Sequence, residues 1–473
     1  MLALGELRRA AGTVLLSPIE LPALGGTDSW RCAQLVGSAD PAAIAAATAD
    51  LRGVAPQIEV ALAPRRGCDV ICLLLTGERH TREKVAAVLS GAPPVLMRGR
   101  SGQWYRVRHF VWRPTSPRWW GRTILAGPLV LFYLLLVELA LIGDLVSRVR
   151  RGRPPVTDPG PVGDARVTFI VPTYNQRALM DFCLPALLQE AGSEHEIVVV
   201  DDAGTDDTAG YVQQTYPAVR VIRLDQNQGF AGAARAGIAT TRTPLFALIN
   251  NDAQVRPGFL RAMLPHFTRP EVFAVCSRIE LPEGSQVETG RVAAAFSGIL
   301  EPHHLPPSEE PTPILYAGGA SSIFHRARYE ALGGFDRLYR PFYWEDIELG
   351  YRAWRAGWES WFEPKASVFH QRRATIGPRF GDAYAEQTFL KNGLLFVLKN
   401  VRDRRLMSRH LGYVAARVLL ELPAGDRRMS GAVRRAMPLM LRALWKRWRE
   451  PRRGDVSDRE IIAQFEFPEG APA

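Results

Sequence analysis

The sequence predicts an α/β protein whose main domain is a doubly wound sheet, and three observations support this fold class. Strand-like runs alternate with helical stretches across residues 165–400, which is the pattern of a doubly wound sheet. A run of apolar residues precedes that region, and an excess of Lys and Arg follows it. A chain of 473 residues is also too long for one ordinary domain, so a smaller domain is expected beside the main one.

Residues 1–115 are expected to form the smaller α/β domain. The runs "QIEVALA" (57–63) and "DVICLLL" (69–75) predict strands, whereas "AAIAAATADL" (42–51) and "TREKVAAVL" (81–89) predict helices. Such alternation favours a short parallel sheet. We find no catalytic group of residues here, so the role of this domain is left open between docking and regulation.

Residues 124–142 are apolar apart from Glu138, and they mark an expected membrane-associated segment over 119–150. Nineteen residues just reach the length that spans a bilayer. Pro128 and Glu138 weaken the case for a span, and arginines on both flanks give no orientation. Three alternatives follow: a single span, a re-entrant or in-plane hairpin, and a buried helix.

A Pro- and Gly-rich linker is expected at 151–164, before the main domain. The positive charge of the chain is concentrated after the main domain, near the C-terminal end. The net charge is +11, and residues 401–453 hold 15 Lys and Arg against 4 Asp and Glu. Leu441 and Trp445 among these arginines fit an interfacial helix better than a solvated face or a nucleic-acid-binding helix. We therefore expect a basic amphipathic helical tail over 401–473, a membrane surface as partner and no nucleic acid.

The cysteines and the first residues indicate the compartment. The five cysteines are scattered and form no CxxC pair, which is typical of reduced thiols in the cytosol. The first residues, "MLALGELRRAAG", lack the charged-then-apolar order of a signal peptide. Together with the apolar segment, these features predict a location at the cytoplasmic face of the cell membrane.

Polar residues follow three successive predicted strands of the main domain. The strands are "VTFIVPT" (167–173), "HEIVVVDD" (195–202) and "TPLFALINND" (243–252). A single acid after a strand usually forms a turn or caps a helix. Ligands of doubly wound sheets, however, bind at the carboxyl ends of the strands, so three such clusters predict one built site. Its candidate residues are Pro172, Thr173, Tyr174, Asn175, Asp201, Asp202, Asn250, Asn251 and Asp252.

The residue types of this site suit a nucleotide bound with a metal ion. Asp201 and Asp202 can accept hydrogen bonds from a base or a ribose hydroxyl. Asp252 is a hard oxygen ligand that suits Mg²⁺ or Mn²⁺ bridging a diphosphate. The glycine-rich run "NQGFAGAARAGI" (227–238) opens a helix and lets the backbone approach a ligand closely. It is neither a GxGxxG nor a Walker loop, so a Rossmann dinucleotide site and an ATPase are not supported.

A second candidate site lies in "FYWEDIELGYRAWRAGW" (342–358), where Glu345 and Asp346 follow three aromatic residues. Acids in the first turn of a helix face the positive end of its dipole, so this pair can serve as a cap. Two adjacent carboxylates behind an aromatic wall can also perform acid–base chemistry. The stretch alone leaves both alternatives open.

Taken in order, these motifs resemble family 2 glycosyltransferases, in particular the rhamnosyltransferase-like branch that builds cell-envelope polysaccharides. The resemblance covers roughly residues 166–400, and its motifs are "VPTYN", "VVVDDAGTDDT", "NQGFAGAARAGI", "INND", "GGASSIFHRARYEALGGFD", "WEDIELGYRAWRAGW" and "FH". It implies the GT-A nucleotide-diphospho-sugar transferase fold, a doubly wound mixed sheet. The implied reaction is inverting transfer from a dTDP-, UDP- or GDP-linked sugar to a saccharide or lipid-linked acceptor.

The resemblance also implies roles for individual residues. Asp346 matches the general base with Glu345 beside it, while Asp252 and His370 match the ligands of Mg²⁺ or Mn²⁺. The metal motif is Asn-Asn-Asp and offers one carboxylate, and Arg235 stands where many relatives have Asn. The implied donor-binding residues are Pro172, Thr173, Tyr174, Asn175, Asp201, Asp202, Asn227, Gly229 and Asn251, and the implied acceptor-binding residues are Trp344 and Gly319.

Two other functions use the same fold, and several conspicuous residues have an ordinary structural explanation. An inactive GT-A domain that serves as a scaffold or sugar-binding subunit is one alternative, and a nucleotidyltransferase is the other. We expect Ser321 and Ser322 to line the acceptor site. His303 and His304 are expected to face solvent from a loop, and core positions are expected for His325, Trp354, Trp358 and Trp361.

Overall fold

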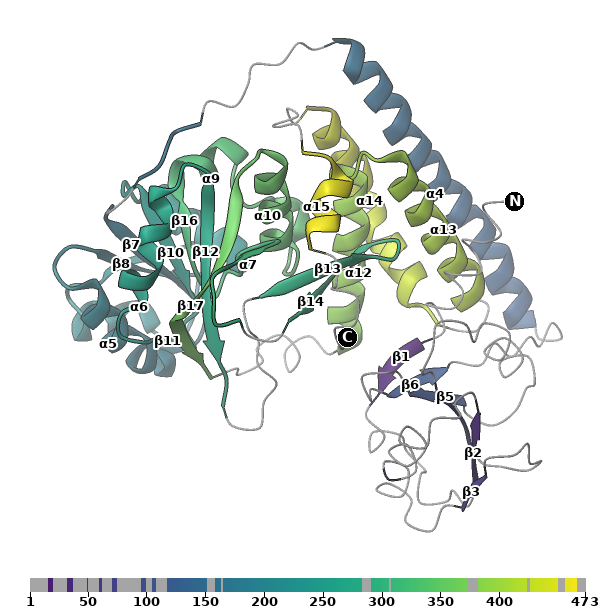
Figure 1. The fold of residues 1–473 in the computed structure, drawn as a ribbon, viewed down its shortest axis with the longest axis horizontal. Coiled ribbons are helices and arrows are strands. Elements are labelled where there is room, and N and C mark those ends of the chain that lie inside the picture. Colours follow the sequence, from purple (N-terminus) through teal and green to yellow (C-terminus); the bar gives the residue numbers. More distant parts are fainter. Residues whose placement is uncertain are drawn as a thin grey trace. The chain divides into compact units, whose positions relative to one another are not determined.

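The computed structural model describes the chain in segments (Figure 1). The described residues are residue 49, six strands before residue 108, and residues 117–150, 158–162, 165–282, 291–305, 308–371, 382–422, 426–449 and 456–465. The chain forms two compact units. The first contains the chain up to residue 135 with residues 408–431, and the second contains residues 136–407 and 432–467. Each unit is described by itself.

The first unit contains a six-stranded sheet in the order β1-β6-β5-β4-β2-β3. Both predicted strands are confirmed as β3 and β4, and neighbouring strands from β3 to β5 pair in parallel. The sheet is mixed, however, because β6 runs antiparallel to both β5 and β1. The two predicted helices, 42–51 and 81–89, lie outside the described residues, apart from residue 49. The strands are β1 (Leu16–Ile19), β2 (Cys32–Val36), β3 (Glu59–Ala61), β4 (Val70–Leu74), β5 (Val95–Arg98) and β6 (Trp104–Val107).

The second unit is built on a mixed sheet in the order β11-β17-β12-β16-β10-β7-β8-β9, with β15 paired to β17. The four strands from β10 to β9 are parallel, and β16 runs antiparallel between β10 and β12. The predicted doubly wound mixed sheet is confirmed. Its strands are β7 (Val167–Thr173), β8 (Glu196–Asp201), β9 (Arg220–Arg223), β10 (Leu245–Ile249), β11 (Ala253–Val255), β12 (Val272–Glu280), β15 (Thr312–Ile314), β16 (Ser321–His325) and β17 (Glu359–His370).

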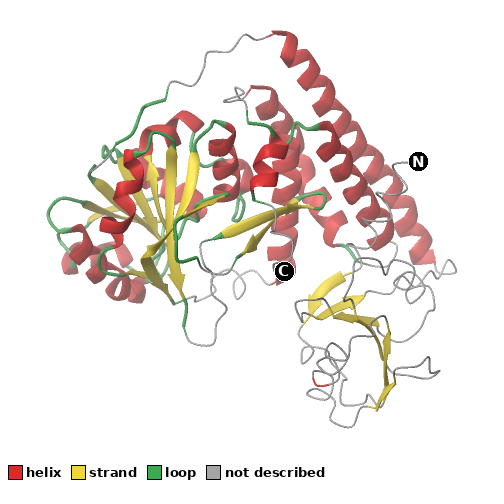
Figure 2. Cartoon of the chain, viewed as in Figure 1, coloured by secondary structure: helices red, strands yellow, loops and turns green. Residues whose placement is uncertain are grey.

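Helices cover both faces of this sheet, because successive side chains of a strand point to opposite faces. In β7, Phe169 and Val171 pack in one core with helices α5, α6 and α8, whereas Ile170 packs in the other core with α7, α9 and α10. Figure 2 shows these helices around the central strands. The helices are α5 (Met180–Ala191), α6 (Thr208–Thr215), α7 (Gly229–Ala239), α8 (Phe259–Met263), α9 (Arg326–Leu332) and α10 (Glu345–Arg355).

Three further helices of the chain's C-terminal part contribute to the second unit: α12 (Asp382–Asn400), most of α14 (Arg428–Arg449) and α15 (Asp458–Gln464). Arg447 of α14 is fully buried and donates to the carbonyl oxygens of Leu398 (2.9 Å) and Val401 (2.6 Å). The side chains of Met440 and Leu444 are buried too, whereas Leu441 and Trp445 are exposed. Part of the expected basic tail is therefore core of the second unit.

Helix α4 (Pro117–Arg150) contains the predicted apolar segment. Its stretch Ile124–Val146 is long and apolar enough to cross a membrane, by length and composition. The side chains of Leu139 and Ile142 are about half exposed (46% and 56%), while Ala140 on the opposite side is buried. One face of the helix is therefore exposed and apolar, which differs from the alternative of a fully buried helix.

The stretch around His303 and His304 differs from the expected loop. Val292–Phe296 (β13) and Leu300–His304 (β14) form a two-stranded antiparallel sheet, and both histidines lie in β14. Burial lowers the pKa of His303. The proline-rich composition that predicted a loop is concentrated after this strand, at residues 306–313.

Candidate active site

The first part of the site is the contact between Asp252 and His370. Strand β11 pairs antiparallel with β17 so that Ala253 faces His370. The Gln371 N–H donates to the carbonyl oxygen of Asp252 at 2.9 Å, which fixes the two chain segments against each other. As a result, His370 Nε2 lies 2.9 Å from the carboxylate Oδ1 of Asp252 and 3.3 Å from Asn250 Nδ2. The structure thus brings the two predicted metal ligands together.

This pair fits a divalent cation. Two ligands that each bind Mg²⁺ at about 2.1 Å in an octahedral shell are about 3 Å apart, close to the separation of the two side chains. The same separation suits a direct hydrogen bond, which a cation would replace. His370 Nδ1 is buried and has no hydrogen-bond partner among the described residues. The described residues contain no group of three or more His, Cys, Asp or Glu that could hold a metal, so phosphates and water would complete the shell.

The ends of β7 and β10 are joined beside that pair. Asn251 Nδ2 donates to Thr173 Oγ1 at 2.9 Å. Asn175 has a positive φ of 52°, and its Oδ1 accepts from the Thr205 N–H at 2.6 Å. Pro172 and Thr173 end the buried strand, and Tyr174 follows, partly exposed. The predicted clusters after two neighbouring parallel strands therefore lie at one edge of the sheet.

Asp201, the last residue of β8, and Asp202, the residue after it, both accept hydrogen bonds from loops. The carboxylate of Asp202 accepts from the N–H groups of Gln228 (2.7 Å) and Gly229 (2.8 Å), and so orients the N-terminus of α7. Gly229 has φ of 72°, which favours glycine at this position. Asp201 Oδ1 accepts from the Gly204 N–H at 2.7 Å. Both side chains are buried, and burial raises the pKa of Asp202.

Glu345 and Asp346 form the second part of the site, at the first turn of α10. Asp346 Oδ1 accepts from the Ile347 N–H at 2.8 Å, and the Gly319 backbone also bonds to this carboxylate. Neither acid is the N-cap, because Trp344 occupies that position with φ of 80° and makes no side-chain cap. The pair lies in the first turn, as predicted, and the capping alternative accounts for one of its contacts.

The two carboxylates have clearly raised pKa values. Burial raises the pKa of Glu345 to about 8, and the neighbouring charge of Asp346 adds to the shift. Burial also raises the pKa of Asp346, to about 6, against backbone hydrogen bonds that lower it. Because the two adjacent carboxylates disfavour each other's charge, the pair tends to keep one proton and carry one negative charge near neutral pH. This arrangement suits a base and a neutral hydrogen-bond donor side by side.

Residues 318–322 connect the two parts of the site. The Asn250 N–H donates to the Ala320 carbonyl at 3.2 Å, beside Gly319, whose backbone bonds to Asp346. The ring of Phe230 packs against Gly319, and a Cβ there would meet it at 2.7 Å. The Asp252 loop, the glycine-rich loop and the carboxylate pair are thus linked through one short segment.

Trp344 is a correction to the expected acceptor site. Its side chain is fully buried and packs against Phe389 and Phe396 of α12, with ring centroids 5.3 and 5.0 Å away. It cannot wall a sugar ring from this position. Phe342 and Tyr343 remain partly exposed and pack edge to face at 4.9 Å. Ser321 and Ser322 are fully buried in β16, which likewise excludes direct contact with an acceptor.

Two residues that sequence reasoning missed, or left without a role, shape this region. Asn392 Nδ2 lies 2.8–2.9 Å from the carbonyl oxygens of Tyr339, Phe342 and Tyr343, so α12 holds the loop before the carboxylate pair. A polar residue inside the apolar run of α12 was the available signal. Arg235 Nη1 donates to the carbonyl oxygens of Phe335 (2.7 Å) and Gly333 (3.2 Å), and so holds the loop that follows α9.

The remaining histidine and tryptophan predictions agree with the structure. His325 is buried, and its Nδ1 accepts from the Arg328 N–H at the start of α9. Trp354 and Trp358 are buried, and the indole of Trp354 donates to the Ile314 carbonyl at 2.9 Å. Trp361 is partly buried against the core beneath α5 and α8. These residues have structural roles.

The mixed sheet, with Asp252 and His370 together at a strand end and Glu345 and Asp346 nearby, agrees with the GT-A fold of nucleotide-sugar transferases. Residues 168–332 match the family model described as glycosyl transferase family 2. Residues 168–332 are therefore a family 2 glycosyltransferase domain, as predicted.

Several curated proteins are similar to this chain. The N-acetylglucosaminyl-diphospho-decaprenol L-rhamnosyltransferase of Mycobacterium tuberculosis is 26% identical over 43% of this chain and 76% of its own length. The pre-mycofactocin glycosyltransferase of the same species is 28% identical over 50% of this chain and 48% of its own length. The succinoglycan biosynthesis protein ExoO of Rhizobium meliloti is 38% identical over 24% of this chain and 31% of its own.

Solved structures are more distant. The crystal structure of GalNAc-T7 with UDP, GalNAc and Mn²⁺ has 17% sequence identity and a TM-score of 0.42, and it covers 50% of this chain and 48% of its own.

Proposed function

We propose that this protein is an inverting glycosyltransferase of cell-envelope polysaccharide synthesis. It moves a sugar from a nucleoside-diphosphate sugar to a saccharide or lipid-linked acceptor. The observation that carries the proposal is the link from the Asp252–His370 pair through Asn250 and Gly319 to Asp346. The names of the rhamnosyltransferase and succinoglycan relatives support the envelope role.

Asp346 acts as the general base in this proposal. Inversion requires a base that takes the proton of the acceptor hydroxyl, opposite the departing diphosphate. The carboxylate of Asp346 bonds to the backbone of Ile347 and Gly319, which holds it in place and favours its ionised form. Glu345 keeps its proton and can donate a hydrogen bond to the acceptor. Gly319 places the acceptor through its contact with Asp346.

Asp252 and His370 hold Mg²⁺ or Mn²⁺ in the proposed enzyme. When bound, the ion neutralises negative charge on the leaving diphosphate. The donor lies along the edge of the sheet, where Asn251 and Thr173 meet. Its proposed contacts are Pro172, Thr173, Tyr174, Asn175, Asp201, Asp202, Asn227, Gly229 and Asn251, and its base is that of a dTDP-, UDP- or GDP-linked sugar.

Helix α4 supports a place at the cytoplasmic face of the cell membrane. Its exposed apolar face includes Leu139, Ile142 and Leu145, which water would solvate poorly. Lipid is a suitable environment for such a face, and the acceptor would then reach the enzyme within the membrane.

Nucleotide binding by the full chain tests the proposal. We would measure the thermal shift with UDP, dTDP or GDP, each with Mn²⁺, Mg²⁺ or EDTA. The proposal expects stabilisation by one nucleotide that depends on the metal and is lost in Asp252→Ala. The matched control is Asp225→Ala, at an exposed acid that is not in the site. No shift with any nucleotide would favour the inactive scaffold.

A further inference from the structure

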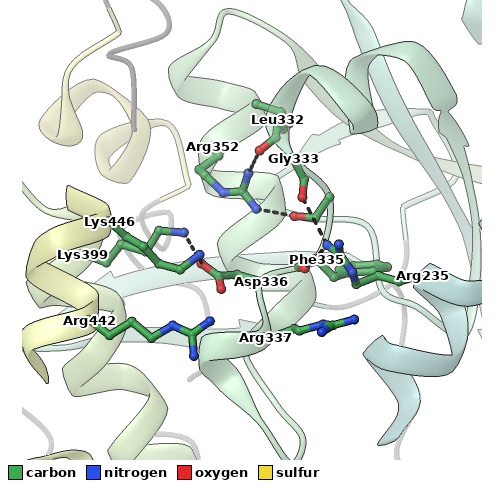
Figure 3. A pocket seen from close by; sticks show the side chains of 11 residues that line it. Arg235, Leu332, Gly333, Phe335, Asp336, Arg337, Arg352, Lys399, Arg442 and Lys446 are labelled. Atoms are coloured by element: carbon green, nitrogen blue, oxygen red, sulfur yellow. Dashed lines mark hydrogen bonds and ion pairs between the residues drawn. The ribbon is translucent and has the colours of Figure 1, made fainter. Parts of the chain in front are cut away.

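A basic cavity of about 350 Å³ lies within the second unit, outside the residues assigned above to donor, metal and base. It is open to solvent and lined by residues of α7, α10, α12, α14 and the loop after α9, as Figure 3 shows. The charged lining residues are Arg235, Asp336, Arg337, Arg352, Lys399, Arg442 and Lys446.

The cavity has more positive than negative charge. Lys399 Nζ lies 2.7 Å from both Asp336 and Glu348, and Lys446 Nζ lies 3.0 Å from Asp336. Burial alone would raise the pKa of Asp336, but the charges of Lys399 and Lys446 hold it well below its usual range. Asp336 and Glu348 are therefore ionised and paired with lysines. The lining contains six cationic side chains, which outnumber these two acids.

Two arginines at the cavity are available for a ligand. Arg337 and Arg442 are exposed, and neither makes a hydrogen bond or ion pair with another described residue. In Figure 3, Arg442 extends from α14 in the direction of Asp336. A guanidinium group matches the geometry of a phosphate, and two of them near buried lysines would attract a multiply charged anion.

The cavity leads toward the carboxylate pair. A second, smaller hollow shares Arg235, Phe335, Asp336 and Arg337 with it and extends to Glu345. An anion in the basic cavity would thus lie on the same loop that ends at Glu345 and Asp346.

The outer side of the cavity adjoins an apolar surface. On α14, Leu441 directly precedes Arg442, and Trp445 directly precedes Lys446. The side chains of Leu441 and Trp445 are 67% and 49% exposed. Because residues four apart share one side of a helix, α14 presents a basic stripe beside an apolar one. Trp448 continues this stripe and packs beside Gly143 of α4, whose neighbour Ile142 is exposed.

We propose that the basic cavity binds the phosphate or diphosphate of an amphiphilic acceptor, whose hydrocarbon chain lies along Leu441 and Trp445. The proposal rests on the proposed function, because it assigns the acceptor of that reaction to a phosphorylated lipid. Arg337 and Arg442 contact the phosphate. The acceptor's sugar extends from there toward Glu345 and Asp346.

Binding of model ligands to the full, detergent-solubilised chain tests this assignment without any transfer reaction. Geranyl diphosphate is the probe, and inorganic pyrophosphate and geraniol carry its two halves separately. We expect geranyl diphosphate to bind at least about tenfold more tightly than either. Equal affinity for pyrophosphate would indicate a site for soluble phosphates, and equal affinity for geraniol would show that the anion is not recognised. Either result would overturn the proposal.

Variants separate this cavity from the donor site. Arg337→Gln/Arg442→Gln should weaken geranyl diphosphate binding at least about tenfold and leave the thermal shift with nucleotide unchanged. The control Arg404→Gln/Arg405→Gln removes the same charge from exposed positions of α13 (Arg404–Glu421) that do not line the cavity. Unchanged binding in the first variant would contradict the proposal. Loss of the nucleotide shift with intact prenyl binding would instead count against the proposed function.

Discussion

Two pairs of adjacent acids near the site, Asp201–Asp202 and Glu345–Asp346, have different surroundings. Asp201 ends β8, Asp202 follows it, and they accept hydrogen bonds from the backbone of Gly204, Gln228 and Gly229. Glu345 and Asp346 begin α10, where burial raises both pKa values, to about 8 and about 6. The first pair accepts hydrogen bonds from the loops that it shapes, whereas the second contains the proposed base.

This difference shows how the environment of a carboxylate determines its work. Backbone N–H groups favour the ionised form and fix the chain around it, so removing such an acid should cost stability. Burial without a cationic partner has the opposite effect, since the folded state then favours the protonated form. Removing such an acid should cost activity and increase stability.

The largest effect is expected for Asp346→Asn. The amide keeps the shape of the side chain but cannot accept the proton, and a general base typically contributes about 10²–10⁴-fold to a rate. We therefore expect transfer to fall about 10³-fold in a single-turnover assay. Nucleotide binding should be retained, and normal turnover would show that another group is the base.

Asp202→Ala should affect folding instead. It removes two hydrogen bonds to the start of α7 from a buried carboxylate, which should lower the free energy of unfolding by about 2–3 kcal/mol. Urea denaturation measures this change, with Asp225→Ala as the exposed control. If the variant loses activity but keeps full stability, Asp202 contacts the donor instead of supporting the fold.

Glu345→Gln should stabilise the protein at alkaline pH. The folded-state pKa of Glu345 is raised above its ordinary value, so its contribution to stability is complete below about pH 4.5 and is lost as pH rises toward about 8. Glutamine does not titrate, so the stability of the variant relative to the unmodified protein should rise by about 3–4 kcal/mol between pH 5 and pH 8. Thermal denaturation at pH 5 and pH 8 checks this, and an equal shift at both would refute it.

The smallest effect is expected for Gly319→Ala. A Cβ at this position would meet the ring of Phe230 at 2.7 Å, so the ring or the backbone must move. Because the Gly319 backbone bonds to Asp346, a small shift should lower the transfer rate about tenfold and stability by about 1 kcal/mol. The double variant with Phe230→Leu should recover much of the loss if the clash is its cause.

Local patterns predicted the parts of the site that lie near strand ends. The apolar runs located β7, β8 and β10, and the rule for parallel sheets placed Thr173, Asp201 and Asp252 at one edge. The resemblance to a family was needed for His370, because the pairing of β11 with β17 joins residues more than a hundred positions apart.

Long-range packing explains what the sequence did not reveal. Trp344 looked like an acceptor contact because it precedes two acids, but α12 buries it through Phe389 and Phe396. The carbonyl oxygens that Arg235 and Asn392 bind belong to loops distant in the chain, so no local pattern announces these contacts. The exposure of Leu441 beside buried Met440 likewise depends on how α14 packs.

The pH dependence of the transfer rate tests the central claim most directly, since it reports the protonation of the base during the reaction. With an ionised Asp346 as base, kcat/KM should be constant above about pH 7 and fall tenfold per pH unit below about pH 6, because kcat/KM reports the pKa values of the free enzyme. Glu345→Gln should keep this limb near pH 6, because Glu345 is uncharged there in the unmodified protein. A rate that stays constant down to pH 4.5, in protein that remains folded, would contradict the assignment of Asp346.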